Sequence, residues 1–171
     1  MLLASQPNAP VARMIINDVG PFVPKAGLDY IASYVGRDPR FADVAEAEAI
    51  FRKVAVAFGS LRDEHWRHLA EISTRPDGNG KLRLHYDMGL ALPYKSPQTD
   101  MSFWPVWDAI TCPVLLLRGT ESNLLLAETA REMTMRGPKT TLVEIAGCGH
   151  APPLMQADQI AIVRGWLAGR A

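Results

Sequence analysis

The sequence predicts an α/β protein built on a short parallel sheet. Three short runs are apolar and rich in aliphatic or β-branched residues: "VARMIIND" at 11–18, "CPVLLLRG" at 112–119 and "TTLVEIAG" at 140–147. Near-continuous apolar runs of this length are typical of strands that are buried on both faces, as in parallel sheets. Helical patterns follow the second and third runs, so residues 112–169 predict a strand–helix–strand–helix unit.

The segment between the first and second strands, residues 21–108, is mostly helical in pattern. Two of its helix-forming stretches begin near aspartates, which are frequent N-cap residues, and two of the stretches end at glycines. The expected helices are 25–36, 43–59 with Asp43 as N-cap, and 62–73 with Asp63 as N-cap. A turn and a short extended segment follow at 75–87, and residues 101–110 are rich in aromatic side chains.

Two further helices complete the pattern. Residues 123–137, "NLLLAETAREMTMRG", have apolar side chains at helical spacing and stop at Gly137 and Pro138. Residues 157–169, "ADQIAIVRGWLAG", are expected to form the C-terminal helix.

Composition narrows the class of protein. The chain has 171 residues, 48% of them hydrophobic, and a formal net charge of zero, which favours a folded globular protein over a disordered chain or a nucleic-acid binder. No stretch has the length of a membrane span, and the first residues lack the basic region of a signal peptide. Cys112 and Cys148 form no disulfide framework and indicate a reducing, cytoplasmic location.

A histidine between glycines is the strongest functional signal. The stretch "GCGHAPPL" at 147–154 places His150 directly after the third strand. Imidazole takes up and returns protons near neutral pH, and loops at the carboxyl ends of parallel strands meet at one edge of the sheet. His150 is therefore a candidate for acid–base chemistry; the alternative is a surface-loop histidine without a role.

Three stretches resemble the C-terminal half of an α/β-hydrolase. They are "MIINDVGPFVPKAGLDYIASYVG", "CPVLLLRGTESNLL" and "LVEIAGCGHAPPLMQADQIAIVRGWL". The resemblance implies a partial α/β-hydrolase fold, with strands six, seven and eight at 11–17, 113–118 and 140–145. It implies a core of residues 1–20 and 109–171, a helical cap at 21–108, and His150 as the histidine of a nucleophile–acid–histidine triad.

The implied activity is hydrolysis of an ester or similar bond in a small, fairly apolar molecule, without metal or organic cofactor. The family's nucleophile lies in a Gly-x-Ser-x-Gly elbow, and this sequence contains no such motif. The stretch "MLLASQPNAP" resembles the tail of the helix after the elbow, so we expect a truncated chain that is inactive alone. The alternatives are a non-catalytic binding or interaction module that keeps the cap and pocket, and a fragment without independent function.

The acid of the triad has two main candidates. The family places an aspartate after strand seven, where "RGTESNLL" has Asn123. Asp18, at the end of the first strand, is the other candidate, and Glu121 is a weaker one. Asn123 also fits a helix N-cap, and Asp18 also fits a brace for the turn before Pro21. Because the position after strand seven matches the family motif, we expect Asn123 to mark a damaged acid position.

The remaining expectations concern ligands. Phe22, Met101, Trp104 and Trp107 are candidate substrate-binding residues, although aromatic side chains at this spacing also suit a packed core. The expected partner is a small-molecule substrate, with neither nucleic acid nor membrane. A first strand without its usual neighbour predicts a homo-oligomer formed through that edge.

Two other pairs of residues are candidates for a metal site and for a Cys–His pair. His65 and His68 lie three apart on a predicted helix, which suits a metal, but no further ligands cluster with them in the sequence. Cys148 lies two residues before His150 and suggests a Cys–His pair, although a small buried cysteine in a tight loop is the commoner case.

Overall fold

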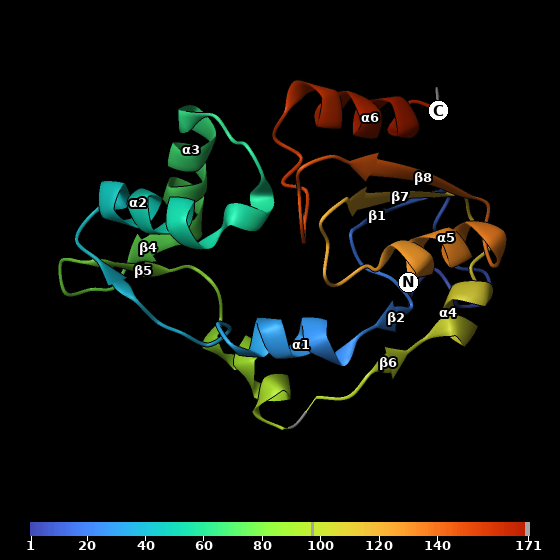
Figure 1. The fold of residues 1–171 in the computed structure, drawn as a ribbon, viewed down its shortest axis with the longest axis horizontal. Coiled ribbons are helices and arrows are strands. Elements are labelled where there is room, and N and C mark those ends of the chain that lie inside the picture. The colour runs from blue at the N-terminus through green and yellow to red at the C-terminus, as the bar shows by residue number, and fades with distance from the viewer. Residues whose placement is uncertain (97, 170–171) are drawn as a thin grey trace. The chain divides into compact units, whose positions relative to one another are not determined.

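A three-stranded parallel sheet organises the fold. The structure, a computed structural model, describes residues 1–96 and 98–169. The sheet has the order β1 (Met14–Asn17), β7 (Val114–Gly119) and β8 (Thr140–Ile145), with β1 parallel to β7 and β7 parallel to β8 (Figure 1). The predicted α/β class with a short parallel sheet is confirmed.

The chain divides into two compact units. We call one the sheet unit, which comprises Met1–Leu28, Ala57–Gly59 and Thr99–Ala171. The other is the helical unit, which comprises Asp29–Val56 and Ser60–Gln98. Each unit is described by itself.

Alternating side chains of β7 explain why helices cover both faces of the sheet. Val114 and Leu116 pack in a core with residues of α5 (Ala127–Met135), whereas Leu115 and Leu117 pack with residues of α6 (Ala157–Leu167). Figure 1 shows these two helices on opposite sides of the sheet. All six residues of β7 are buried, as expected for the central strand of a parallel sheet.

The sheet unit extends beyond the predicted core of 1–20 and 109–171. A two-residue antiparallel ladder joins β2 (Phe22–Val23) to β6 (Met101–Ser102), and the short helix α4 (Trp104–Asp108) follows. Trp107 of α4 is fully buried in the core that contains Val114. Pairing and burial thus attach both ends of the predicted insert to the sheet, because these ends bury apolar surface there. Whether the insert acts as a cap stays a prediction.

The helical unit combines helices with a small antiparallel sheet. Its helices and strands are α1 (Lys25–Ala32, which begins in the sheet unit), β3 (Arg40–Phe41), α2 (Val44–Val54), α3 (Asp63–Ser73), β4 (Thr74–Pro76), β5 (Leu82–Leu84) and the 3₁₀ segment η2 (Met88–Lys95); a second 3₁₀ segment, η1 (Val56–Phe58), overlaps the unit boundary. The strands have the order β3-β5-β4. Phe41, Ala47 and Ala70 are fully buried and form its core.

The helix ends test two predicted caps. The Asp43 carboxylate accepts a hydrogen bond from the Glu46 amide at 2.9 Å, so the N-cap of α2 is confirmed. The prediction for Asp63 is wrong: α3 already includes Asp63, and its N-cap position is Arg62, which makes no side-chain capping bond. Asp63 instead places its charge in the first turn of α3, where a carboxylate is favourable.

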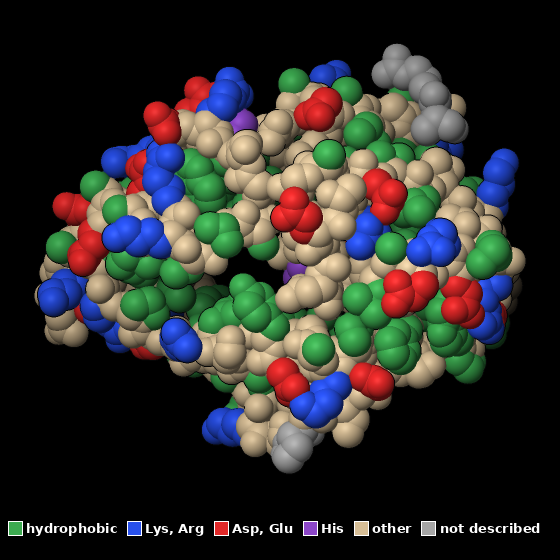
Figure 2. Space-filling view, in the orientation of Figure 1, with side chains coloured by type: hydrophobic (Ala, Val, Ile, Leu, Met, Phe, Trp, Pro, Cys, Tyr) green, Lys and Arg blue, Asp and Glu red, His purple; other side chains and the backbone are tan. Residues whose placement is uncertain are grey.

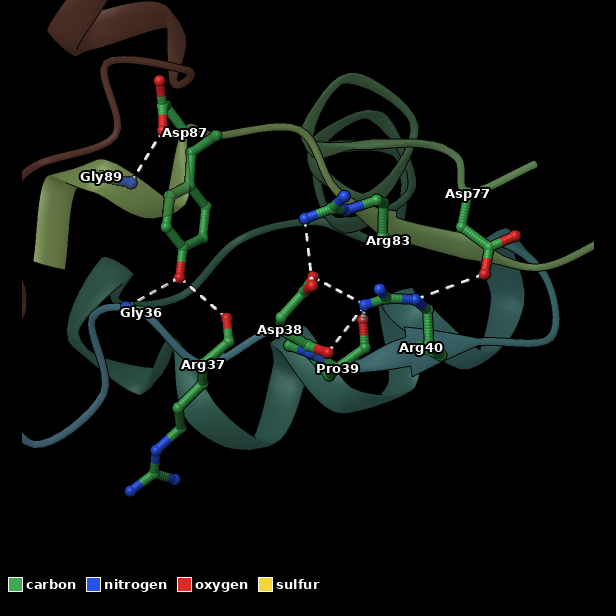
Figure 3. Close-up of polar contacts among 10 residues, drawn as sticks. Gly36, Arg37, Asp38, Pro39, Arg40, Asp77, Arg83, Asp87 and Gly89 are labelled. Carbon is green, nitrogen blue, oxygen red and sulfur yellow. Dashed lines mark hydrogen bonds and ion pairs between the residues drawn. The ribbon is translucent and has the colours of Figure 1, made fainter. Parts of the chain in front are cut away.

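A network of ion pairs links β3 and β5 of the small sheet in the helical unit to Asp38 and Asp77 (Figure 3). Arg40 of β3 contacts Asp38 at 2.7 Å and Asp77 at 3.3 Å, and Arg83 of β5 contacts Asp38 at 3.0 Å. Asp77 also accepts the amides of Asn79 at 2.7 Å and Lys81 at 3.1 Å. These backbone bonds, and then Arg40, hold the pKa of Asp77 below its usual range.

Charges of both signs are interspersed over the face drawn in Figure 2. Across the part of the chain that the structure describes, no helix combines the length and hydropathy needed to cross a bilayer.

We predict that acid weakens the helical unit through Asp77. A carboxyl whose pKa is lower in the folded than in the unfolded state stabilises the fold above its unfolded pKa, and this stability is lost as the pH falls through the folded value. Asp77→Asn should therefore lower the melting temperature near neutral pH, and the difference from wild type should shrink below about pH 4. Circular dichroism melts across this range measure both effects.

The matched control is Asp87→Asn. Asp87 also accepts a hydrogen bond from a backbone amide, that of Gly89 at 2.7 Å. Among the residues that the structure describes, Asp87 forms no ion pair. An Asp77→Asn melting curve that matches the control at every pH would contradict the prediction.

We also propose that β1 mediates self-association, as the sequence suggests. Met14 and Asp18 donate their amides toward β7, so the amides of Ile15 and Asn17 point to the opposite edge, where no strand lies in the described ranges. Such an edge pairs readily with another chain.

Light scattering at high concentration should show a dimer or larger species. Ile15→Pro, which removes an outward amide, should shift the equilibrium toward monomer. A wild-type monomer would contradict this.

Candidate active site

The end of β1 presents a carboxylate at the carboxyl edge of the sheet. The Asp18 amide donates to the Leu117 carbonyl at 2.8 Å, which extends the pairing of β1 with β7 by one residue. Asp18 itself has φ of 60°, in the left-handed region that aspartate tolerates better than most residues. This conformation turns the chain sharply toward Pro21 and keeps the side chain at the sheet edge.

The Asp18 carboxylate is fully buried and well supplied with donors. Its Oδ1 accepts the Gly119 amide at 2.9 Å, and its Oδ2 accepts the Ser122 hydroxyl at 2.6 Å. A buried carboxylate is costly unless donors replace the water it has lost. The end of β7 and the loop after it supply two of these donors.

His150 supplies the third donor. Its Nδ1 lies 2.9 Å from Asp18 Oδ2 and 3.0 Å from the Asp18 carbonyl oxygen. A carbonyl oxygen only accepts, as does an ionised carboxylate, so Nδ1 carries the proton. In the neutral ring Nε2 then has the free lone pair that a general base needs, and the side chain is 29% exposed.

Close packing of two loops brings His150 to Asp18. A Cβ at Gly119 would lie 2.4 Å from the Gly149 carbonyl oxygen and 2.5 Å from that of Cys148, so only glycine fits at the end of β7. The Glu121 amide donates to the Cys148 carbonyl at 2.8 Å. The loop after β7 and the histidine loop are therefore in direct backbone contact.

The structure separates the acid candidates. Asp18 contacts His150, whereas the side chains of Asn123 and Glu121 are exposed and have no recorded hydrogen bond to His150 in the described residues. The N-cap reading of Asn123 is wrong, because α5 begins at Ala127 and its N-cap position is Leu126. The local motif favoured Asn123, but the geometry gives His150 its carboxylate from the neighbouring strand.

The aromatic candidates do not gather around His150. The Trp107 indole donates to the Arg136 carbonyl at 3.0 Å, and the Trp104 ring lies 4.6 Å from the Arg136 guanidinium. Arg136 precedes β8, so both indoles lie toward the amino ends of the strands, opposite His150. Phe22 is half-buried and only four residues from Asp18, and Met101, on the strand paired with that of Phe22, is 40% exposed.

The other candidate pairs are also placed. The Cys148 thiol lies 3.8 Å from the Phe58 carbonyl oxygen and 3.7 Å from that of Ala146, and burial raises its pKa. His65 is buried and its Nε2 lies 3.0 Å from an Arg62 nitrogen. No group of three possible metal ligands occurs among the residues that the structure describes.

A parallel sheet with a His–Asp pair at its carboxyl edge is typical of hydrolases with a nucleophile–acid–histidine triad. The sequence profile of the alpha/beta hydrolase family matches residues 2–163, and the chain belongs to this family. It is 36% identical over 178 residues to a 3-hydroxybutyrate-oligomer hydrolase from Cupriavidus necator, a match that covers 99% of this chain and 61% of that protein.

Solved structures show the same fold. An alpha/beta hydrolase from Novosphingobium aromaticivorans matches with a TM-score of 0.86 and 33% identity, over 99% of this chain and 61% of that one. A protein from Rickettsia typhi matches with a TM-score of 0.89 and 29% identity, over 99% of this chain and 58% of that one. The chain thus spans about three-fifths of the length of these relatives.

Two residues of the site were not singled out for these roles by the sequence. They are Ser122, whose hydroxyl donates to Asp18, and Gly119, whose amide does the same. The sequence signal for Gly119 is its position at the end of an apolar strand, where glycine allows another backbone to approach closely.

We predict that Gly119→Ala separates the two loops. The new methyl group would meet backbone carbonyls, which cannot swing aside as a flexible side chain can, so the His150 loop should move away from Asp18. We expect a clear fall in melting temperature and loss of the Nδ1 proton signal of His150 in NMR spectra.

Gly165→Ala is the matched control. Gly165 lies inside α6, and a Cβ there meets nothing within 4 Å, so alanine should preserve or raise stability. If Gly119→Ala behaved like Gly165→Ala in both measurements, the close packing would not hold the site together.

Proposed function

We propose that His150 and Asp18 form the proton-transfer half of a hydrolytic site that cleaves an ester bond in a small, fairly apolar molecule. One observation carries this proposal: His150 Nδ1 lies 2.9 Å from the buried Asp18 carboxylate, which leaves Nε2 free to accept a proton. Membership in the alpha/beta hydrolase family supports it.

The proposed reaction uses His150 twice. Nε2 accepts the proton of a hydroxyl nucleophile as that oxygen attacks the ester carbonyl, and Asp18 stabilises the imidazolium that results. The imidazolium then gives its proton to the departing alcohol. Water attacks the acyl intermediate by the same route, which releases the acid and restores the nucleophile.

The nucleophile is the part that this sequence does not supply in the family's motif. Ser122 does not replace it, because its side chain is buried and its hydroxyl donates to Asp18. We therefore propose that the chain alone is inactive toward esters and that activity requires a segment with a Gly-x-Ser-x-Gly elbow.

The substrate class that we propose is a short ester of a hydroxy acid. The support is the Cupriavidus necator relative, whose name describes hydrolysis of 3-hydroxybutyrate oligomers. Such a molecule is small and carries both apolar methyl groups and ester carbonyls, in agreement with the class that the sequence implies.

We predict that reconstitution separates the two acid candidates. The chain would be co-expressed with an α/β-hydrolase segment that carries the elbow, and hydrolysis of p-nitrophenyl acetate and of a 3-hydroxybutyrate dimer would be measured. Asp18→Asn should lower kcat by about 10⁴, as the corresponding change does in serine proteases, because the imidazolium loses its charged partner. Asn123→Asp should change kcat little, because residue 123 is exposed and makes no hydrogen bond to His150 among the described residues.

His150→Ala is the control for background hydrolysis, and the chain without the added segment is the control for the nucleophile. A large rise in kcat for Asn123→Asp, with Asp18→Asn fully active, would show that the acid position is 123. Turnover by the chain alone that depends on both His150 and Ser122 would overturn the proposed requirement for an elbow.

A further inference from the structure

The Ser122 hydroxyl has every hydrogen-bonding position filled. Its oxygen accepts the amides of Leu124 at 3.2 Å and Leu125 at 3.0 Å, and it lies 2.6 Å from Asp18 Oδ2. A hydroxyl has one proton and two lone pairs. Since the two amides use the lone pairs, the proton points to Asp18 and has no other direction open to it.

This arrangement discriminates between the two forms of Asp18. An ionised carboxylate accepts the Ser122 proton, the His150 Nδ1 proton and the Gly119 amide together. A protonated carboxyl oxygen would find no lone pair left on Ser122 to receive its hydrogen. The hydroxyl therefore supports the charged form, and the two amides that bind it polarise it further.

We propose that Ser122 is a positioning residue, which holds the Asp18 carboxylate in the orientation that accepts the Nδ1 proton of His150 and so fixes His150 as the Nδ1–H tautomer. Its meaning for catalysis rests on the proposed function. The effect is transmitted from Ser122 through Asp18 to His150, and Ser122 itself touches no reacting atom.

A purely structural role for Ser122 makes a different prediction. The bonds to Leu124 and Leu125 shape the turn that leads into α5, so loss of the hydroxyl would lower stability in either case. Only a positioning role links the hydroxyl to the state of the His150 ring. The test therefore reads the ring directly.

The experiment is NMR of the ¹⁵N-labelled chain, with the His150 ring signals assigned by their loss in His150→Gln. Wild type should show His150 as the Nδ1–H tautomer with a slowly exchanging Nδ1 proton. In Ser122→Ala this proton should exchange with water at least about tenfold faster, the size expected for losing one hydrogen bond to a charged group. Ser122→Thr, which keeps the hydroxyl, should restore slow exchange.

Two controls define the outcome. Ser33→Ala removes an exposed hydroxyl that donates to the Tyr30 carbonyl, and should leave the His150 ring unchanged. In an Asp18→Asn background, Ser122→Ala should add no further change to the ring. If Ser122→Ala lowers the melting temperature but leaves Nδ1 exchange within about twofold of wild type, the role is structural only and the proposal is overturned.

A wild-type measurement covers the case in which Ser122→Ala does not fold. The Ser122 hydroxyl proton, held by Asp18, should give its own resonance and a cross-peak to the His150 Nδ1 proton. A hydroxyl proton that exchanges too fast to be seen would overturn the proposal. None of these measurements uses hydrolysis, so an inactive reconstituted enzyme would count against the proposed function and leave the positioning role standing.

Discussion

The site depends on the burial of one carboxylate. Asp18 is fully buried, and its two oxygens receive donors from three separate places: the Gly119 amide, the Ser122 hydroxyl and the His150 ring. These donors replace the water that a carboxylate loses on burial. The end of β1, the loop after β7 and the loop after β8 are therefore tied to one another through Asp18.

The backbone at Asp18 makes this convergence possible. The chain bends at Asp18, where φ is 60°, and the carbonyl oxygen and Oδ2 of this residue both face His150 Nδ1. Unfavourable backbone conformations persist where the surrounding structure holds them and often occur at functional sites. Two acceptors from a single residue hold the ring more firmly than a carboxylate alone. Rotation of the His150 side chain about Cα–Cβ or Cβ–Cγ would break at least one of the two contacts.

Local patterns predicted the strands, most helices and the histidine loop, because apolar periodicity and glycine placement are properties of short segments. The partner of His150 could not be predicted in this way. Asp18 and His150 are 132 residues apart in sequence, and their contact depends on a glycine that lets two backbones approach. Trp107 shows the same limit, because helical spacing of aromatic residues is identical for a packed core and for a ligand surface.

The position of a charge matters more here than its match to a motif. The loop after β7 carries Asn123 where the family usually has an aspartate, and its contribution to Asp18 is the buried Ser122 hydroxyl. The side chain at 123 is exposed, so a carboxylate there would be surrounded by water and its attraction for the imidazolium would be screened. The carboxylate of Asp18 is shielded from water and keeps most of its electrostatic effect. In this chain the strand next to β7 supplies the charge, and the loop after β7 holds that charge in place.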